Sequence, residues 1–378
     1  MAGKRWEGCP LEEAYFGDDR KVGKAQRKRA QDKDRSQYKK TDRAKSDKKT
    51  LLQSSLMEAN DRLLRGRVLS ITPQGIVVDY DGRKIICALK GLLKKDKSQF
   101  KNLVTVGDFV RFEESGGNEG TIVHVEPRVS VLSRADNLSR RKAQLIAANI
   151  DQVMIVVSVI SPPLKPFLVD RYIIAARKGG MAPIIIVNKI DLLQDLSLEP
   201  EQLEQENALH QAFLQAYEQA GVPVISISAV TGDGMDDLRA AMQGKASVFS
   251  GQSGVGKSSL INVMTGLDLR IGEVVERTQK GSHTTTTTNL IQLPFGGWCI
   301  DTPGIKSFGV WDLKFDEVES YFSEIHACGR ECKYPRCSHT DEPDCAVRIA
   351  IEEGKISVLR YQSYQYLIHS VKQEHLRR

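Results

Sequence analysis

The sequence has no long hydrophobic run. No stretch approaches the roughly 18–20 uncharged apolar residues that a helix needs to cross a bilayer. The N-terminus also lacks the apolar segment of a secretory signal. We therefore expect a cytoplasmic protein with no membrane partner. With 378 residues, 40% hydrophobic and 27% charged, the chain has the composition of a globular protein of two or three domains.

Apolar side chains are scarce in the segment from Arg20 to Lys49, where basic residues are concentrated. The first 50 residues hold 16 Lys and Arg against 9 Asp and Glu, a balance of +7 in a chain of net charge +6. Such a segment buries too little apolar surface to fold. We predict that residues 1–61 form a disordered basic arm and lead-in, with a short helical pattern over residues 51–64. The arm either solubilises the protein or contacts phosphate backbones, and the pattern fits both.

The cysteines do not form the pattern of a disulfide framework. There are seven, an odd number, and four of them lie between Cys328 and Cys345. Without a secretory signal, a reducing compartment is expected, and there a cysteine cluster more often indicates a metal site.

Residues 62–130 have the pattern of a small β-barrel. Short stretches rich in β-branched residues are interrupted at Pro73–Gly75 and at Asp81–Gly82, both of which are hairpin signals. Five such strands favour an OB-fold, with an SH3-like barrel as the alternative.

Residues 131–312 alternate between apolar runs and helical patterns, which predicts an α/β domain with a mostly parallel sheet. The runs at 152–160 and 182–188 are continuous, as in strands buried on both faces. Helices are expected over 168–178, 199–220 and 236–242. Residues 313–378 are predicted to form a helical domain, with its last stretch, from Ile351, as one helix with a basic end.

A phosphate-binding loop is complete at residues 251–258. GQSGVGKS matches G-x-x-x-x-G-K-[ST], follows an apolar strand and precedes a helical pattern. Its backbone N–H groups would wrap the phosphates, Lys257 would reach the β- and γ-phosphates, and Ser258 would ligate Mg²⁺. The residues predicted to bind here are Gly251, Gln252, Ser253, Gly254, Val255, Gly256, Lys257, Ser258 and Ser259.

The tetrapeptide NKID, residues 188–191, ends a buried strand and predicts guanine recognition. Asp191 can accept two hydrogen bonds from guanine, Asn188 would brace the site, and the stem of Lys189 would cover the ring. The sequence ISISA ends another strand, and the backbone near Ser228 and Ala229 is expected to contact the guanine oxygen.

The sequence WCIDTPG, residues 298–304, predicts a strand that delivers Asp301 to the Mg²⁺ shell and Gly304 to the γ-phosphate. The preceding GSHTTTTT has the character of a switch loop, in which we favour Thr285 or Thr286 as the Mg²⁺ ligand. In this chain the guanine motif precedes the phosphate loop, the reverse of the common GTPase order. A circular permutation of the GTPase domain accounts for that order.

Together the permuted order, RRKAQLIAANIDQV (residues 140–153), GSHTTT, DTPGIKSFGVW and the cysteine cluster resemble the bacterial family of small-ribosomal-subunit-dependent GTPases, RsgA. The resemblance covers about residues 62–370. It implies an N-terminal OB-fold, a permuted GTPase domain and a C-terminal zinc-binding domain. It also implies GTP hydrolysis to GDP on the small (30S) ribosomal subunit, with its 16S rRNA, during late maturation. We expect a monomer.

The residue after Gly304 is Ile305, where Ras-type enzymes have a water-orienting glutamine. The isolated enzyme should therefore be slow. His283 is the best substitute, because a neutral imidazole can position water, and the matching histidine of the family has the same expected role. The alternative is that His283 only packs or caps the switch loop.

The cysteine cluster offers a Cys₃His set for one structural zinc ion per chain: Cys332, Cys337, His339 and Cys345. This set matches the ligand pattern of the family. From spacing alone, Cys328 could replace Cys332.

Two further functions compete with a ribosome-stimulated GTPase. In one, the chain is a GTP-regulated RNA-binding scaffold whose turnover is incidental, and bases stack on Tyr361 and Tyr364 unless these belong to the core. In the other it is a small-molecule kinase, which the guanine preference of Asp191 argues against.

Overall fold

The computed structural model describes residues 63–90, 103–136, 139–194, 197, 199–266, 288–301 and 313–376. The chain divides into two units, Met1–Asp61 and Arg62–Arg378, and all described residues belong to the second. The basic arm therefore lies outside the described residues, as does the predicted lead-in helix up to residue 62. Its last two residues are not helical, because Leu64 already belongs to a strand. Within the described part of the chain, no helix combines the length and the apolar character needed to span a membrane.

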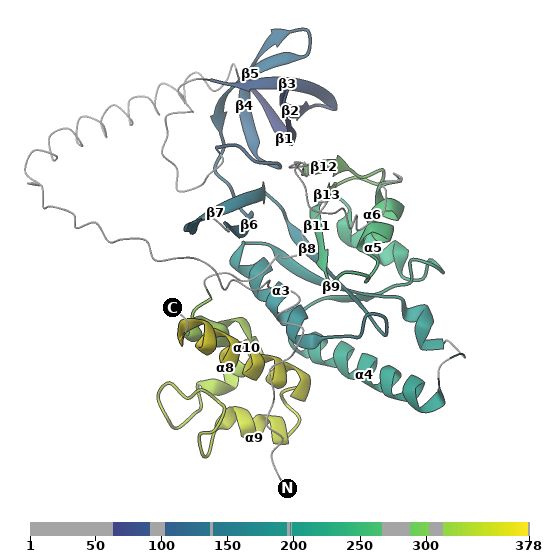
Figure 1. Cartoon of the computed structure of the whole chain (residues 1–378), viewed down its shortest axis with the longest axis vertical. Helices are drawn as coiled ribbons and strands as arrows, with labels where there is room; N and C mark the ends of the chain where they lie inside the picture. Colours follow the sequence, from purple (N-terminus) through teal and green to yellow (C-terminus); the bar gives the residue numbers. More distant parts are fainter. Residues whose placement is uncertain are drawn as a thin grey trace, which may run out of the picture. The chain divides into compact units, whose positions relative to one another are not determined.

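Five strands form a closed barrel at the start of the described chain (Figure 1). They are β1 (Leu64–Thr72), β2 (Gly75–Tyr80), β3 (Arg83–Leu89), β4 (Phe109–Gly116) and β5 (Glu119–Val125). Their order is β1-β2-β3-β5-β4, and β4 pairs again with β1 to close the sheet. Only β3 and β5 pair in parallel. This closed, OB-like barrel confirms the predicted fold, including the tight turn at Asp81 and Gly82, both at positive φ.

A hairpin of β6 (Val131–Asp136) and β7 (Ser139–Ala148) follows the barrel. The sequence analysis did not identify these strands. Between barrel and hairpin, the buried Asn149 donates from Nδ2 to the carbonyl oxygen of Gly107, and its Oδ1 accepts from the backbone N–H of Val129. Arg67 of β1 donates to the carbonyl oxygen of Asn149 at 2.7 Å. These bonds fix the hairpin against the barrel.

The next eleven elements form the α/β domain. In chain order they are β8 (Gln152–Ser158), α3 (Pro166–Lys178), β9 (Ala182–Asn188), η3 (Ile190–Gln194), α4 (Pro200–Gln219), β10 (Val224–Ser226), α5 (Met235–Met242), β11 (Ala246–Gly251), α6 (Lys257–Thr265), β12 (Asn289–Gln292) and β13 (Trp298–Asp301). The strand order is β10-β9-β8-β11-β13-β12, all parallel except β12. β12 also pairs with β1, so the sheet continues into the barrel.

The sheet is buried on both faces, as its continuous apolar runs predict. On β8, Val153 and Ile155 pack in one cluster with residues of α3 and α4, whereas Met154 and Val156 pack in another with residues of α5 and α6. Figure 1 shows these helix pairs on opposite sides of the strands. The three predicted helices correspond to α3, α4 and α5.

The C-terminal helices form a third core. They are α7 (Phe315–Val318), η4 (Glu319–Tyr321), α8 (Ser323–Gly329), α9 (Ala346–Glu352) and α10 (Val358–Leu376). The prediction of one helix from Ile351 to the end is wrong, because α9 ends at Glu352. The backbone of Gly354 has φ 73°, a left-handed conformation that no helix continues, and a second helix, α10, then begins.

The C-terminal helices pack on α3 through a shared core and a buried ion cluster. Ile174 of α3 belongs to the C-terminal apolar core. Arg360 of α10, 2% exposed, donates to Asp170 of α3 and, at 2.7 Å, to Glu324 of α8. Its guanidinium also lies over the ring of Phe322, 4.4 Å from the centroid. The buried guanidinium of Arg360 thus joins a carboxylate of the α/β domain to a carboxylate of the C-terminal helices.

Candidate nucleotide site and metal centre

The phosphate-loop motif spans residues 251–258, where β11 ends and α6 begins at Lys257. Two of its glycines are required by close approaches. A Cβ on Gly251 would stand 2.1 Å from the carbonyl oxygen of Val156, and one on Gly256 would stand 2.4 Å from Nδ2 of Asn188. Ser253, Gly254 and Ser258 are exposed. The loop therefore lies against β8 and the end of β9, with its tip and the N-terminus of α6 open to a ligand.

Lys257 closes the loop on itself. Its ammonium donates to the carbonyl oxygen of Gly251 at 2.8 Å and also to that of Gln252. Because the N-terminal turn of α6 leaves backbone N–H groups unpaired within the helix, ammonium and amides together make this loop electropositive. That charge favours an anionic ligand.

Asn188, at the end of β9, joins three segments. Its side chain is buried, and Nδ2 donates to the carbonyl oxygen of Val255 in the phosphate loop at 2.9 Å. Its Oδ1 accepts from the backbone N–H of Lys189 at 2.8 Å and of Ala229 at 3.3 Å. The amide therefore couples the NKID segment to the phosphate loop and to the loop after β10.

Lys189 makes a second connection to the phosphate loop. Its backbone has φ 65°, and its ammonium donates to the carbonyl oxygens of Gly254 at 2.8 Å and Ser161 at 2.5 Å. The sequence analysis expected the stem to cover a base and did not identify these bonds. Two side chains of one tetrapeptide thus hold the loop that lies more than sixty residues further along the chain.

Asp191 is oriented by the loop after β10. Ser228, fully buried, donates from its hydroxyl to Oδ1 of Asp191 at 2.6 Å. The same hydroxyl accepts from the backbone N–H groups of Val230 and Thr231. The sequence predicted a backbone role for Ser228 and missed its side chain. The available signal was a serine two residues after β10, the strand that pairs with β9.

The switch residues are described only in part. β13 ends at Asp301 and pairs in parallel with β11, so their carboxyl ends lie at the same edge of the sheet. The side chain of Asp301 lies outside the described residues, as do His283, Thr285, Thr286, Gly304 and Ile305. Gln252 and Ser259 flank the exposed part of the phosphate loop. The roles assigned to these residues stay predictions.

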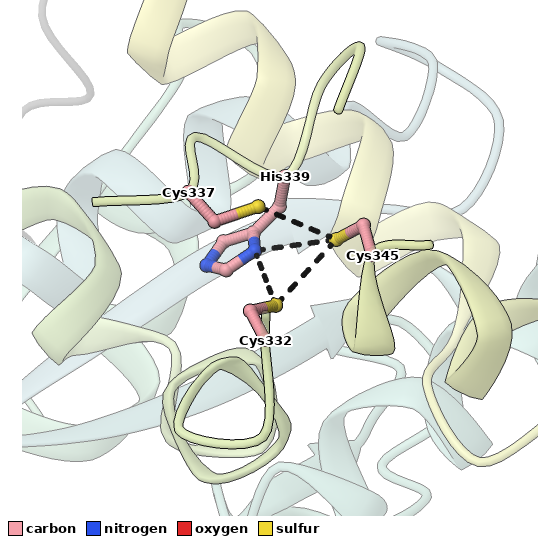
Figure 2. Close-up of side chains that lie close together, drawn as sticks. All are labelled: Cys332, Cys337, His339 and Cys345. Carbon is pink, nitrogen blue, oxygen red and sulfur yellow. Dashed lines mark hydrogen bonds between the residues drawn. The ribbon is translucent and has the colours of Figure 1, made fainter. Parts of the chain in front are cut away.

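Cys332, Cys337, His339 and Cys345 converge in the segment between α8 and α9 (Figure 2). Their ligand atoms all lie within 4.8 Å of one another. Nδ1 of His339 is 3.5 Å from the sulfur of Cys332 and 3.4 Å from that of Cys345. The sulfur of Cys345 is 3.8 Å from that of Cys332 and 3.7 Å from that of Cys337. These sulfurs are too far apart for disulfides, whose S–S bond is about 2.05 Å.

The spacing fits a tetrahedral metal ion. Ligand distances of about 2.3 Å for sulfur and about 2.0 Å for nitrogen give tetrahedron edges of about 3.8 Å between sulfurs and about 3.5 Å between sulfur and nitrogen. The four side chains therefore form a group that could hold a metal. Burial raises the pKa of the Cys337 thiol to about 12, so that a nearby cation is needed to favour its thiolate. Cys328 lies outside this group of four.

The loop that carries the ligands is held by Glu342, which the sequence analysis did not select, and by Tyr361 and Tyr364, which it considered for base stacking or for the core. Although burial of Glu342 works in the opposite direction, N–H and hydroxyl donors from residues 338–341 lower the pKa of its carboxyl to about 2. Tyr361 donates to the carbonyl oxygen of His339 at 2.6 Å, and Tyr364 donates to that of Ser338 at 3.2 Å. Tyr364 is 2% exposed and therefore belongs to the core.

Comparison with known proteins identifies the family. A sequence model described as RsgA GTPase matches residues 125–311. A protein of Ectopseudomonas mendocina named small ribosomal subunit biogenesis GTPase RsgA is 38% identical over 319 residues, which cover 82% of this chain and 89% of that protein. The chain belongs to the RsgA GTPase family. It is thus a member of a family of GTP-hydrolysing enzymes.

Other relatives and solved structures agree with the RsgA assignment. A Chlorobaculum parvum protein of the same name is 39% identical, covering 82% of this chain and 98% of that protein. The crystal structure of YjeQ from Thermotoga maritima matches with a TM-score of 0.64 and 29% identity, over 82% of this chain and 98% of that one. YloQ, described as a circularly permuted GTPase, matches with a TM-score of 0.64 and 27% identity, over 82% and 96%. The predicted permutation, barrel and GTPase fold are confirmed, whereas the exact domain limits stay predictions.

Proposed function

We propose that this chain is a GTPase stimulated by the small ribosomal subunit, which it binds through 16S rRNA during late maturation. The names of its relatives, small ribosomal subunit biogenesis GTPase RsgA, support this role. The observation that carries the enzymatic part is the pair of contacts from Asn188 to Val255 and from Lys189 to Gly254. Because these contacts join the guanine motif to the phosphate loop, one nucleotide can reach both.

Guanine is read by Asp191, whose second carboxylate oxygen and fixed orientation suit two N–H donors on one edge of the base. The hydrogen bond from Ser228 supports this orientation before any ligand binds. The backbone near Ala229 donates to the guanine oxygen, and the Lys189 stem covers the ring. Adenine presents the wrong donor pattern for Asp191.

The phosphates lie in the loop from Gly251 to Ser259, with Lys257 at the β- and γ-phosphates. The residues that would hold Mg²⁺ are Ser258, Asp301 and either Thr285 or Thr286. Bound Mg²⁺ would neutralise charge that develops on the phosphate oxygens. The exposure of Ser258 at the first turn of α6 fits this assignment.

His283 orients the attacking water and the backbone of Gly304 contacts the γ-phosphate. Ile305 cannot orient water, so the free enzyme hydrolyses GTP slowly. Docking on the small subunit completes the site. The chain acts as a cytoplasmic monomer whose GTP form docks and whose GDP form is released.

One structural Zn²⁺ per chain binds Cys332, Cys337, His339 and Cys345. Three soft sulfur ligands and one imidazole favour zinc over Mg²⁺ or Ca²⁺, and their separations suit its tetrahedral geometry. None of the four ligands acts as a general acid or base, so we assign the ion a structural and not a catalytic role. The ion stabilises the small C-terminal core.

The competing function is a scaffold in which GTP holds the docked form and turnover is incidental. Multiple-turnover GTP hydrolysis distinguishes the two, measured alone, with purified small subunits, and with large subunits as the control. We expect small subunits alone to raise GTP turnover, with ATP turned over at background rate. Turnover that small subunits leave unchanged would support the scaffold.

A His283→Ala variant tests the catalytic assignment in the same assay. GTP binding should persist, because the imidazole acts on water and not on the nucleotide. Stimulated turnover should fall about 10²-fold or more, as for loss of a general acid–base group. Stimulated turnover equal to that of the wild type would remove His283 from the mechanism.

A further inference from the structure

The imidazole of His339 has one nitrogen in the metal cluster and one outside it. Nδ1 faces the sulfurs of Cys332 and Cys345. Nε2 is buried and has no hydrogen-bond partner among the described residues. A buried N–H without an acceptor is destabilising, so a group that accepts from Nε2 is expected nearby.

Glu319 of η4 supplies a carboxylate on that side of the ring. Its Oε2 lies 3.6 Å from Nε2 of His339. Its other oxygen, Oε1, accepts from Nδ1 of His326 at 3.0 Å, and Nε2 of His326 contacts Arg330 at 3.3 Å. The carboxylate is therefore held by α8 through one oxygen, while the other faces the buried imidazole a few tenths of an ångström beyond hydrogen-bond distance.

Gly329, the last residue of α8, gives an independent sign that this approach is specific. A Cβ at this position would lie 3.0 Å from Oε1 of Glu319 and 3.0 Å from Nε2 of His339. The φ of Gly329 is not in the left-handed region, so its backbone conformation does not require glycine. Glycine is favoured here because there is little space: a larger side chain would press against both the carboxylate of Glu319 and the imidazole of His339.

We propose that Glu319 is a positioning residue of the metal centre, which accepts a hydrogen bond from Nε2 of His339 across the space that Gly329 leaves open. The carboxylate holds the ring proton on Nε2, leaves the lone pair of Nδ1 for the metal and fixes the ring plane. A carboxylate behind a ligating imidazole also raises its basicity. This inference rests on the proposed metal centre and adds a residue outside the Cys₃His set.

The test measures Zn²⁺ affinity of the full chain by competition with a chromophoric chelator. Glu319→Ala should bind Zn²⁺ about 10- to 100-fold more weakly than the wild type, as for other lost partners of metal-bound histidines. Glu319→Gln, whose amide oxygen still accepts, should fall between the two. Glu317→Gln is the matched control: Glu317 lies two residues away, pairs with Lys178, and should leave the affinity unchanged.

His326→Asn and Gly329→Ala separate the positioning role from a general effect on α8. Loss of His326 removes only the outer partner of Glu319, so its effect on Zn²⁺ affinity should be smaller than that of Glu319→Ala. Gly329→Ala should weaken binding because its methyl group separates Glu319 from His339. Nitrogen-15 NMR of the His339 ring should show the proton on Nε2 in the wild type and a mixed tautomer in metal-free Glu319→Ala.

The possible outcomes distinguish failure of the metal centre from failure of the positioning role of Glu319. If the wild-type chain binds no Zn²⁺, the proposed metal centre fails, and the positioning role fails with it. If the wild type binds one Zn²⁺ while Glu319→Ala and Gly329→Ala keep wild-type affinity, the centre stands and the positioning role is overturned. Should Glu319→Ala not fold, Glu319→Gln decides, because it conserves the size of the side chain.

Discussion

The guanine end of the nucleotide site and the Cys/His cluster are each built from separated segments, but different interactions assemble them. At the guanine end, Asn188, Lys189 and Ser228 each donate to another group of the protein at 2.5–2.9 Å. In the cluster, three thiols and an imidazole approach one another, and only a cation can draw three thiolates together. We infer that the chain alone organises the first region, whereas the second depends on its metal.

Removal of the metal should give the largest difference between the two regions. Structural zinc contributes about 10–16 kcal/mol to the folding of zinc-finger peptides, so a chelator should unfold the loops around α8 and α9. Binding of fluorescent GDP should persist, because no cluster residue contacts the guanine site among the described residues. Hydrogen exchange maps the first effect and fluorescence the second. Equal loss of structure at both regions would contradict the comparison.

Arg360→Met should weaken the packing of the C-terminal helices, which flank the cluster, on α3 of the α/β domain. The substitution leaves Asp170 and Glu324 buried without their cation, a change that costs about 3–5 kcal/mol. Urea unfolding should show a lower midpoint, with the C-terminal helices unfolding first. Arg348→Met on α9 is the control: its side chain is exposed, and its effect should stay within about 0.5 kcal/mol. Equal midpoints for the two variants would show that the ion cluster does not stabilise the packing of the C-terminal helices on α3.

Asn188→Ala should weaken the guanine site without affecting the cluster. The variant leaves the carbonyl oxygen of Val255 and the N–H of Ala229 without their partner, at a cost of about 1–3 kcal/mol. Affinity for GDP should fall about 10-fold or more, measured by fluorescence titration, while zinc content stays at the wild-type value. Asn207→Ala on α4 is a control of equal size. Unchanged GDP affinity would mean that the coupling of the two motifs is dispensable.

The smallest effect is expected at Glu342, whose pKa is lowered to about 2 by the donors around it. Because its folded pKa lies below its ordinary value near 4.5, its contribution to stability is present above that value. This contribution is lost as the pH falls from about 4.5 towards 2. Wild type and Glu342→Gln should therefore differ in melting temperature at neutral pH and converge in acid. A difference independent of pH would contradict the role of the charge.

The fold could be predicted from the sequence where one physical signal dominates. Continuous apolar runs predicted β8 and β9, turn residues predicted the barrel hairpins, and the order of motifs predicted the permutation. The hairpin of β6 and β7 was missed because its sequence, rich in basic residues around Arg140, does not alternate clearly. The single C-terminal helix was wrong because Gly354 was not given weight as a terminator.

The site residues that carry motifs could be selected from sequence, but their supporting partners could not. Ser228 was selected only for its backbone, and its hydroxyl bond to Asp191 comes from the fold. Glu342 and Glu319 are ordinary polar residues, and only the fold brings them to the ligand loop and to His339. Spacing left Cys328 as an alternative to Cys332, because Cys328-x₃-Cys332 and Cys332-x₄-Cys337 are both spacings that zinc sites use. The fold brings Cys332 into the group of four.

The central claim is that distant segments meet around one guanine nucleotide, and Asp191→Asn tests it most directly. An amide in place of the carboxylate should reverse the hydrogen bonding to the base, so that the variant loses GDP affinity by about 10²-fold and gains affinity for xanthosine diphosphate. Competition between fluorescent GDP and xanthosine diphosphate measures both changes. A variant that still prefers GDP over xanthosine diphosphate as the wild type does would contradict the account.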